Sequence, residues 1–216
     1  MSMTEIKVAT TADLGKIAIC HRAAFPASLS TALGLDYVKK MLGWYLSTEN
    51  TFLFYLEAEG RCIGYCGAMI RKEAGMGSAS SMAQYSFDRA LQSFLVRPWL
   101  LLHRELRAKY LFIGRNLWTR IKRLATGKQK NAPTAPAVFD PYVALVVIGV
   151  SESEQGKGYG SQILQEFERR TVQLGYKKML LSVLTNNSKA IKSYKRNGWV
   201  ATNVNGKSTS MEKNIE

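Results

Sequence analysis

The feature that most constrains the fold is an apolar run that leads into a glycine-rich loop and then into a helix. Residues 142–150 read YVALVVIGV and contain no charged residue, which is typical of a strand buried on both faces of a sheet. The loop that follows places glycine at positions 156, 158 and 160, and a helix is expected over 159–174. This order of strand, loop and helix predicts an α/β domain with a ligand site at the end of the strand.

The loop has the chemistry of a diphosphate-binding site. Glycines at alternate positions let the backbone approach a ligand closely, and the free N–H groups of a helix N-terminus attract anions. Gln155, Lys157 and Ser161 can add side-chain donors. The P-loop pattern is absent from the sequence, and the dinucleotide-binding pattern fails because residue 161 is serine. The alternative interpretation is a glycine-rich loop without a ligand.

A second motif follows at a fixed distance. The loop reads Gln155-Gly156-Lys157-Gly158-Tyr159-Gly160, and it is followed by Asn187, Ala190, Tyr194, Gly198 and Trp199 in the spacing Asn-x-x-Ala-x-x-x-Tyr-x-x-x-Gly-Trp. With both motifs in this order, the chain resembles the GNAT superfamily of acetyl-CoA-dependent N-acetyltransferases, loosely over 1–70 and well over 138–213. The resemblance implies an α/β fold (an α+β mixed sheet), largely antiparallel, with helices on both faces and a helical insertion between the third and fourth strands.

The resemblance also implies roles for individual residues. The diphosphate of acetyl-CoA is expected on the loop backbone, from Gln155, Gly156, Lys157, Gly158, Tyr159 and Gly160 to Ser161. The pantetheine arm is expected along Ile148, Gly149 and Val150, with Asn187 on its far side. Tyr194 is the expected catalytic acid, because a phenol can protonate a leaving thiolate. The alternative for Tyr194 is a packing role on an amphipathic helix.

The general base is not evident from the sequence. Many members of the family place a carboxylate inside the fourth strand, but the interior of 142–150 holds none. Asp140 is the nearest acidic candidate for a catalytic role, although a turn position before Pro141 explains it equally well. Catalysis through water, or without a dedicated base, remains open. His21 and Phe25 are expected to border the acceptor site, where packing is the commoner role for a histidine.

The rest of the chain predicts one domain, 1–216, with a basic helical insertion at 71–137. Strands are expected at 5–9, 51–58, 61–70 and 178–184, and in a hairpin, 199–204 and 207–213, with a type I′ turn at Asn205-Gly206. Helices are expected from Asp13 onward and at 31–47 and 188–197. Within the insertion, a loop is expected at 74–83, a helical segment interrupted by Pro98 at 85–125, and a linker at 127–137.

The insertion carries most of the chain's charge. It holds 13 Lys and Arg against 3 Asp and Glu, which accounts for +10 of the net +14. Three interpretations stay open: a helical hairpin packed on the core, a lid that binds a phosphorylated acceptor, or an element that lies on an anionic membrane surface through 85–125, where Trp99, Phe112 and Trp118 accompany the charge. Nucleic-acid binding is not favoured, because the segment contains no recognisable reader motif.

The sequence therefore predicts an acyltransferase that uses acetyl-CoA as cosubstrate and acetylates a primary amine of a small molecule, such as a phosphorylated or nucleotide-linked amino sugar, by direct attack in a ternary complex. The alternatives are a non-catalytic CoA-binding or membrane-docking module, or acetylation of a protein or peptide amine. Cys20, Cys62 and Cys66 are expected to be core thiols, and no metal site is expected. No leader or membrane span is evident, so the expected location is the cytoplasm, with peripheral association at the inner membrane surface as an option. The sequence does not predict the oligomeric state.

Overall fold

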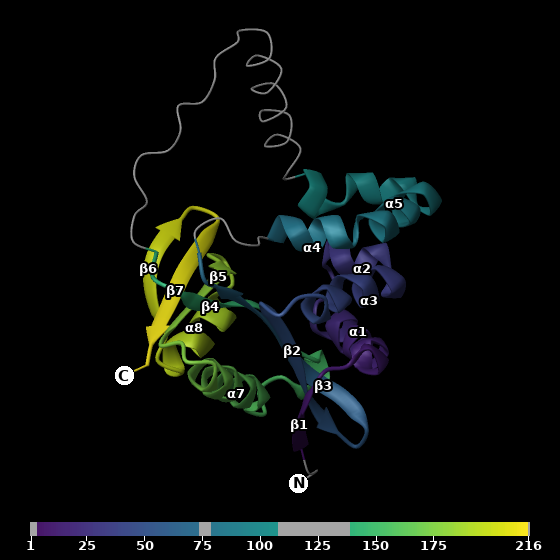
Figure 1. The fold of residues 1–216 in the computed structure, drawn as a ribbon. Coiled ribbons are helices and arrows are strands. Elements are labelled where there is room, and N and C mark those ends of the chain that lie inside the picture. The colour runs from purple at the N-terminus through teal and green to yellow at the C-terminus, as the bar shows by residue number, and fades with distance from the viewer. Residues whose placement is uncertain (1–3, 74–78, 108–138, 216) are drawn as a thin grey trace, which may run out of the picture.

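The fold is built on one seven-stranded sheet, as Figure 1 shows for the residues that the computed structural model describes, 4–73, 79–107 and 139–215. The strand order is β1-β2-β3-β4-β5-β7-β6. Neighbouring strands are antiparallel except for β4 and β5, which are parallel. The strands are β1 (Thr4–Val8), β2 (Thr51–Ala58), β3 (Arg61–Arg71), β4 (Tyr142–Val150), β5 (Lys178–Leu184), β6 (Val200–Asn205) and β7 (Ser208–Asn214). The expected mixed, largely antiparallel sheet is confirmed.

Helices cover both faces of this sheet. On one face lie α1 (Leu14–Ala24) and α3 (Leu35–Gly43), and on the other lie α7 (Tyr159–Gln173) and α8 (Ser188–Arg196). Further helical elements are α2 (Leu29–Leu33), α4 (Ala79–Tyr85), α5 (Phe87–Val96) and the short 3-10 turns η1 (Thr11–Asp13), η2 (Trp44–Leu46), η3 (Pro98–Leu102) and η4 (Glu152–Glu154). Residues 104–107 are helical as well.

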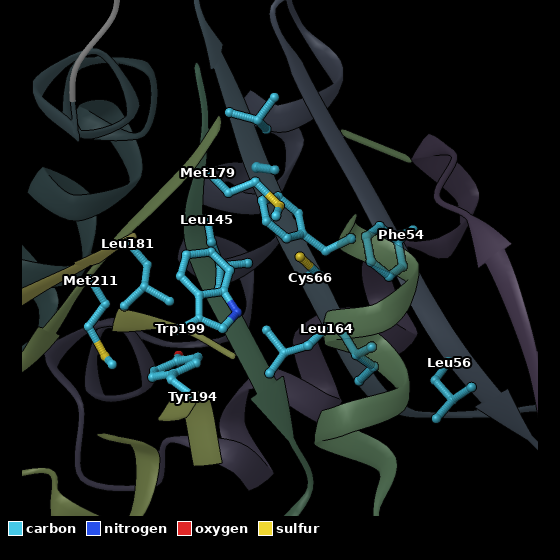
Figure 2. Packing of buried hydrophobic residues seen from close by; sticks show 14 of the residues in the cluster. Phe54, Leu56, Cys66, Leu145, Leu164, Met179, Leu181, Tyr194, Trp199 and Met211 are labelled. Atoms are coloured by element: carbon cyan, nitrogen blue, oxygen red, sulfur yellow. The ribbon is translucent and has the colours of Figure 1, made fainter. Parts of the chain in front are cut away.

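Two hydrophobic clusters hold the helices to the sheet. Along β2, Phe54 and Leu56 point toward α7, whereas Leu53 and Tyr55 point toward α1 and α3, because side chains alternate along a strand. Figure 2 shows the first cluster, in which Trp199 packs beside Tyr194 and Leu145. Both faces are buried, so the central strands appear in the sequence as continuous apolar runs instead of alternating ones.

Two glycines permit close packing on the α1 side of the sheet. A Cβ at Gly67 would lie 2.6 Å from the ring of Tyr45. A Cβ at Gly149 would lie 2.8 Å from the Tyr65 ring and 2.9 Å from the Phe25 ring. Helix α1 and turn η2 therefore approach β3 and β4 as closely as they do only because these strands have no side chain at those positions.

Several predicted elements differ from the structure. The helix expected at 31–47 is divided at Gly34, whose φ of 103° no right-handed helix accommodates. The loop expected at 74–83 is helical from Ala79, where α4 begins. The helical segment beyond residue 107 and the linker at 127–137 lie outside the described residues.

The expected type I′ turn at Asn205-Gly206 is wrong. Asn205 still pairs with Ser208, so the turn consists of Gly206 and Lys207, and neither Asn205 nor Gly206 has a positive φ. The two-residue turn with positive φ at both positions lies instead between β2 and β3, at Glu59 (51°) and Gly60 (74°).

The helices between β3 and β4 pack on α2 and α3. The hydroxyl of Ser93 donates a hydrogen bond to the carbonyl of Leu33 at 2.8 Å, and Arg97 donates one to the carbonyl of Ala32 at 3.1 Å. Lys40 of α3 lies over the ring of Tyr85 at 4.7 Å. Within the described residues, no helix combines the length and the apolar character needed to cross a membrane.

Candidate active site

The candidate active site begins where β4 and β5 separate. The two strands pair only from Val143 to Leu145 on β4 and from Met179 to Leu181 on β5. On the opposite edge of β4, Leu145 and Val147 face consecutive residues of β3, so Val146 is an extra residue without a partner. Such a bulge bends a strand. The carboxyl ends of β4 and β5 consequently diverge, and the sheet opens between them.

A cavity of about 760 Å³ occupies this opening. Its walls come from the ends of both strands, the glycine-rich loop, α8 and the end of α1. Its lining residues are Ala24, Phe25, Val146, Val147, Ile148, Val150, Gln155, Gly156, Gly158, Gly160, Ser161, Leu164, Ser182, Val183, Leu184, Asn187, Lys189, Ala190, Ser193, Tyr194, Arg196 and Asn197. The lining is apolar along the strands and polar at the loop and α8. An elongated ligand with a polar head fits this distribution.

The glycine-rich loop forms one end of the cavity. Gly156 (φ 84°) and Gly158 (φ 87°) take a left-handed conformation that favours glycine, and Gly158 immediately precedes α7. Gly160 has no such backbone constraint, and a Cβ there would meet no protein atom within 4 Å. Packing within the chain therefore does not require glycine at 160, whereas a backbone that lies against a diphosphate does. The loop fits the group that its sequence implies.

The side chains of the loop are placed unequally. Gln155 lines the cavity, where its Nε2 donates a hydrogen bond to the carbonyl of Val150 at 3.1 Å. Lys157 instead pairs with Glu154 at 2.9 Å, and Tyr159 packs against the hydrophobic core. Neither Lys157 nor Tyr159 lines the cavity. Only their backbone N–H groups remain available for the predicted role in cofactor binding.

Asn187 and Tyr194 both reach the cavity from α8. The Asn187 side chain accepts a hydrogen bond from the N–H of Ala190 at 3.1 Å and so caps the helix that carries Tyr194. Tyr194 is 9% exposed and packs beside Trp199, with ring centroids 6.1 Å apart (Figure 2). Burial raises the pKa of Tyr194 to about 12. The phenol is thus protonated at neutral pH and can donate a proton.

The three strand residues expected to contact the cofactor are divided by the pleat of β4. Ile148 and Val150 line the cavity. Gly149 lies between them and faces α1, where Tyr65 and Phe25 would collide with any side chain. Because Gly149 has no side chain, α1 can pack closely against β4. The end of α1 then supplies Ala24 and Phe25 to the cavity wall.

Asp140 lies outside the cavity. Its carboxylate pairs with Lys178 at 2.9 Å and is 66% exposed. It precedes β4, whereas the cavity lies at the carboxyl end of that strand. Among the described residues that line the cavity none is acidic, so this part of the chain supplies no carboxylate base.

His21 does not line the cavity but packs against Phe25, which does. Its Nδ1 lies 2.6 Å from the Tyr65 hydroxyl and its Nε2 lies 2.8 Å from the Ser30 hydroxyl. Burial lowers the pKa of His21 to about 4, so the ring is neutral at physiological pH. Its ring centroid lies 5.1 Å from that of Phe25, which does line the cavity. Both ring nitrogens are engaged within the chain, which favours the packing role.

Two cations in the cavity wall were not predicted. Lys189 and Arg196 come from the two ends of α8. Lys189 stands between Asn187 and Ala190, so its place within the second motif could have indicated that it faces the cofactor site. Arg196 follows Tyr194 by two residues and had no comparable indication.

Residues 113–199 match the sequence profile of the acetyltransferase (GNAT) family. This match supports the resemblance to the GNAT superfamily that the two motifs indicate. Acetyl-CoA is the acetyl donor of this acyltransferase family, and the expected enzyme class and cosubstrate are confirmed at that level. A comparison with curated proteins gave no match.

Solved GNAT structures share the fold over almost the whole chain. PaiA N-acetyltransferase from Thermoplasma acidophilum, in complex with coenzyme A, is 13% identical with a TM-score of 0.54, and the match covers 99% of both chains. The ribosomal-protein-S18-alanine N-acetyltransferase from Escherichia coli is 15% identical with a TM-score of 0.55, and the match covers 99% of this chain and 94% of the other. An aminoglycoside N-acetyltransferase in complex with CoA is 15% identical with a TM-score of 0.57, covering 95% and 93%. Identities this low establish the fold alone.

Proposed function

We propose that this chain transfers the acetyl group of acetyl-CoA to a primary amine of a small molecule, by direct attack of the amine within a ternary complex. The observation that carries the proposal is the cavity between the diverging ends of β4 and β5. One end of it is a glycine-rich loop at a helix N-terminus, and Tyr194 contributes a buried phenol to its wall.

The glycine-rich loop and the end of β4 would bind different parts of the donor. The N–H groups from Gln155 to Ser161 would hold the diphosphate, with Lys189 and Arg196 adding positive charge from α8. The edge of β4 beyond Leu145 no longer pairs with β5, so its backbone groups would pair with the amides of the pantetheine arm. The donor supplies the acetyl group as a thioester, whose C–S bond breaks as the new amide bond forms.

Tyr194 would act on the sulfur side of the reaction. Its phenol would donate a proton to the departing sulfur, and the proton lost by the attacking amine would pass to solvent. Because no carboxylate lines the described part of the cavity, the amine would be deprotonated through water or before it binds. Asp140 has no part in this proposal, because the structure places it outside the cavity. The three cysteines are buried, and a covalent acetyl-cysteine is not proposed.

The acceptor that suits this site is neutral or anionic. Apart from the two cations assigned to the donor, the described residues of the cavity supply no charged side chain, and carboxylates are the groups that select polycationic amines. A phosphorylated or nucleotide-linked amino sugar therefore fits the site better than a polyamine. A peptide amine is the competing acceptor, since a GNAT fold alone does not determine the substrate.

The test measures release of free thiol from acetyl-CoA. Four amine pools are supplied separately: nucleotide-linked amino sugars, unphosphorylated amino sugars, polyamines and peptides. We expect turnover with the phosphorylated sugars at a kcat/KM at least about tenfold above that of the others. Turnover with peptides alone would overturn the acceptor class. Binding of acetyl-CoA without thiol release from any pool would indicate a binding module, and failure to bind CoA would overturn the cosubstrate itself.

A further inference from the structure

The helices between β3 and β4 expose an unusual amount of apolar surface. Seven large apolar side chains of α5 and η3 are between 47% and 75% exposed. These residues, which we call the α5–η3 surface, are Phe87, Leu91, Leu95, Val96, Trp99, Leu101 and Leu102. Scattered exposed apolar residues are normal on a soluble protein, but a concentration on two adjoining elements marks an interaction site.

The exposure of these side chains does not arise because α5 is loosely packed on the rest of the protein. The opposite side of α5 is fixed to α2 by the hydrogen bond from Ser93 to Leu33, and Arg97, just after α5, bonds to Ala32. Phe87, Leu91 and Leu95 recur every four residues and so form one stripe along α5. Leu100 is buried, while its neighbours on η3, including Trp99, point outward. The packing of α5 therefore presents the apolar stripe to the exterior.

The charge around this surface indicates its partner. Arg89 on α5 and Arg104 and Arg107 just after η3 are exposed, and Arg89 lies 3.8 Å from the carboxylate of Asp88. Within the described residues 79–107, four arginines stand against two acidic residues, Asp88 and Glu105. Two copies of the chain that met through this surface would bring its exposed arginines together, whereas an anionic surface would attract each copy by about 1 kcal/mol for every basic residue near it.

We propose that the α5–η3 surface docks this enzyme on the face of an anionic lipid bilayer. Leu95 and Trp99 would enter the boundary between headgroups and acyl chains, where an indole is favoured. The neighbouring arginines would bind lipid phosphates. A bilayer would contact the protein on this one side only. This inference is independent of the acceptor and of the acetyl-transfer proposal, because none of its residues lines the cavity.

The test is flotation of the full chain with lipid vesicles. One set of vesicles is pure phosphatidylcholine, and the other contains about 30% phosphatidylglycerol, each in low and high salt. The chain should float with the anionic vesicles in low salt and lose part of that binding in high salt. The double variant L95Q/W99Q should lose binding by a factor of ten or more. Neither substitution alters charge, so the loss would report the apolar contact and not electrostatics.

The matched control is V200Q/V204Q, which removes two equally exposed apolar side chains from β6. It should float like the parent chain, and all variants should keep the parent's thermal midpoint. Equal flotation of L95Q/W99Q and the parent would overturn the α5–η3 surface as the docking site. No flotation of the parent with anionic vesicles would overturn the membrane as partner. A dimer in solution that L95Q/W99Q converts to a monomer would assign the surface to a second copy instead.

Discussion

Lys189 and Gln155 join the two walls of the active-site cavity. The Nζ of Lys189, in the first turn of α8, donates a hydrogen bond to Oε1 of Gln155 at 2.9 Å. The same Gln155 amide donates from Nε2 to the carbonyl of Val150, the last residue of β4. One side chain of the glycine-rich loop thus connects the end of β4 with the helix that carries Tyr194. A diphosphate bound at the loop would offer Lys189 a charged partner in place of a neutral amide.

Lys189→Ala should raise the dissociation constant of CoA roughly fivefold to tenfold, because the cavity loses a cation where the diphosphate is expected to bind. Calorimetric titration with CoA measures this. Lys192→Ala makes the same change of charge on the same helix at an exposed position outside the cavity, and should leave the affinity within about twofold. Equal effects of the two substitutions would assign the loss to net charge.

Tyr194→Phe should lower kcat by roughly tenfold to a hundredfold and leave the affinity for acetyl-CoA nearly unchanged, because it removes the proton donor but keeps the ring that packs beside Trp199. Steady-state kinetics and direct titration separate the two quantities. Since burial raises the pKa of Tyr194 to about 12, no loss of rate from deprotonation of Tyr194 is expected below about pH 10. A parallel fall in kcat, affinity and thermal midpoint would indicate a packing role.

Gly160→Ala should lower the affinity for CoA without lowering the stability of the fold. A Cβ at 160 meets no protein atom within 4 Å, and alanine is the better helix former, so the free energy of unfolding should hold or rise by up to about 1 kcal/mol. The methyl group would nevertheless obstruct a diphosphate at the loop, and CoA affinity should fall at least fivefold. Urea titration and calorimetry measure the two effects.

Gly149→Ala is the comparison for that variant. Its Cβ would lie 2.8 Å from the Tyr65 ring and 2.9 Å from the Phe25 ring, so α1 must move away from β4. Overpacking of this kind costs about 1–3 kcal/mol. Gly149→Ala should therefore be less stable than Gly160→Ala. An equally stable Gly149→Ala variant would show that α1 moves away from β4 at little cost.

Stability should fall in mild acid through His21. Its folded pKa is about 4 and its usual pKa is 6.5, so between these values the unfolded chain binds the proton that the folded chain does not. Stability is therefore complete above about pH 6.5 and declines as the pH falls toward 4, by at most about 3 kcal/mol. Urea titrations from pH 4 to 8 should show a weaker pH dependence in His21→Gln. An unchanged dependence would assign the decline to other groups.

The elements that the sequence predicted well are those whose pattern is local. Strands 142–150 and 178–184 have the predicted bounds, because a strand buried on both faces appears as a continuous apolar run. The glycine-rich loop was recognisable because helix starts and positive φ values restrict the residue type, whereas the capping role of Asn187 was not predicted. Gly34 carried the same kind of information, but its break in the helix expected at 31–47 was missed.

Which residues form the site depends on their distances in space and not on their spacing along the chain. Asp140 and Val150 both belong to the segment that the sequence singled out, but ten residues of extended chain separate them by roughly 30 Å. Lys189 and Gln155 are 34 residues apart and hydrogen-bonded. Neither fact follows from spacing along the chain, because both depend on the direction of β4 and on the strand that lies beside it.

By itself, the sequence indicated the resemblance to the superfamily, the donor and the order of the elements, since these rest on residue types that the backbone or the diphosphate demands at fixed positions. Only the tertiary structure decided where β4 and β5 part, which side chains meet in the opening, and that the apolar stripe of α5 points outward. The reason is that strand divergence and burial are set by packing among elements distant in the sequence. The residue pattern within one element does not show which of its faces another element will cover.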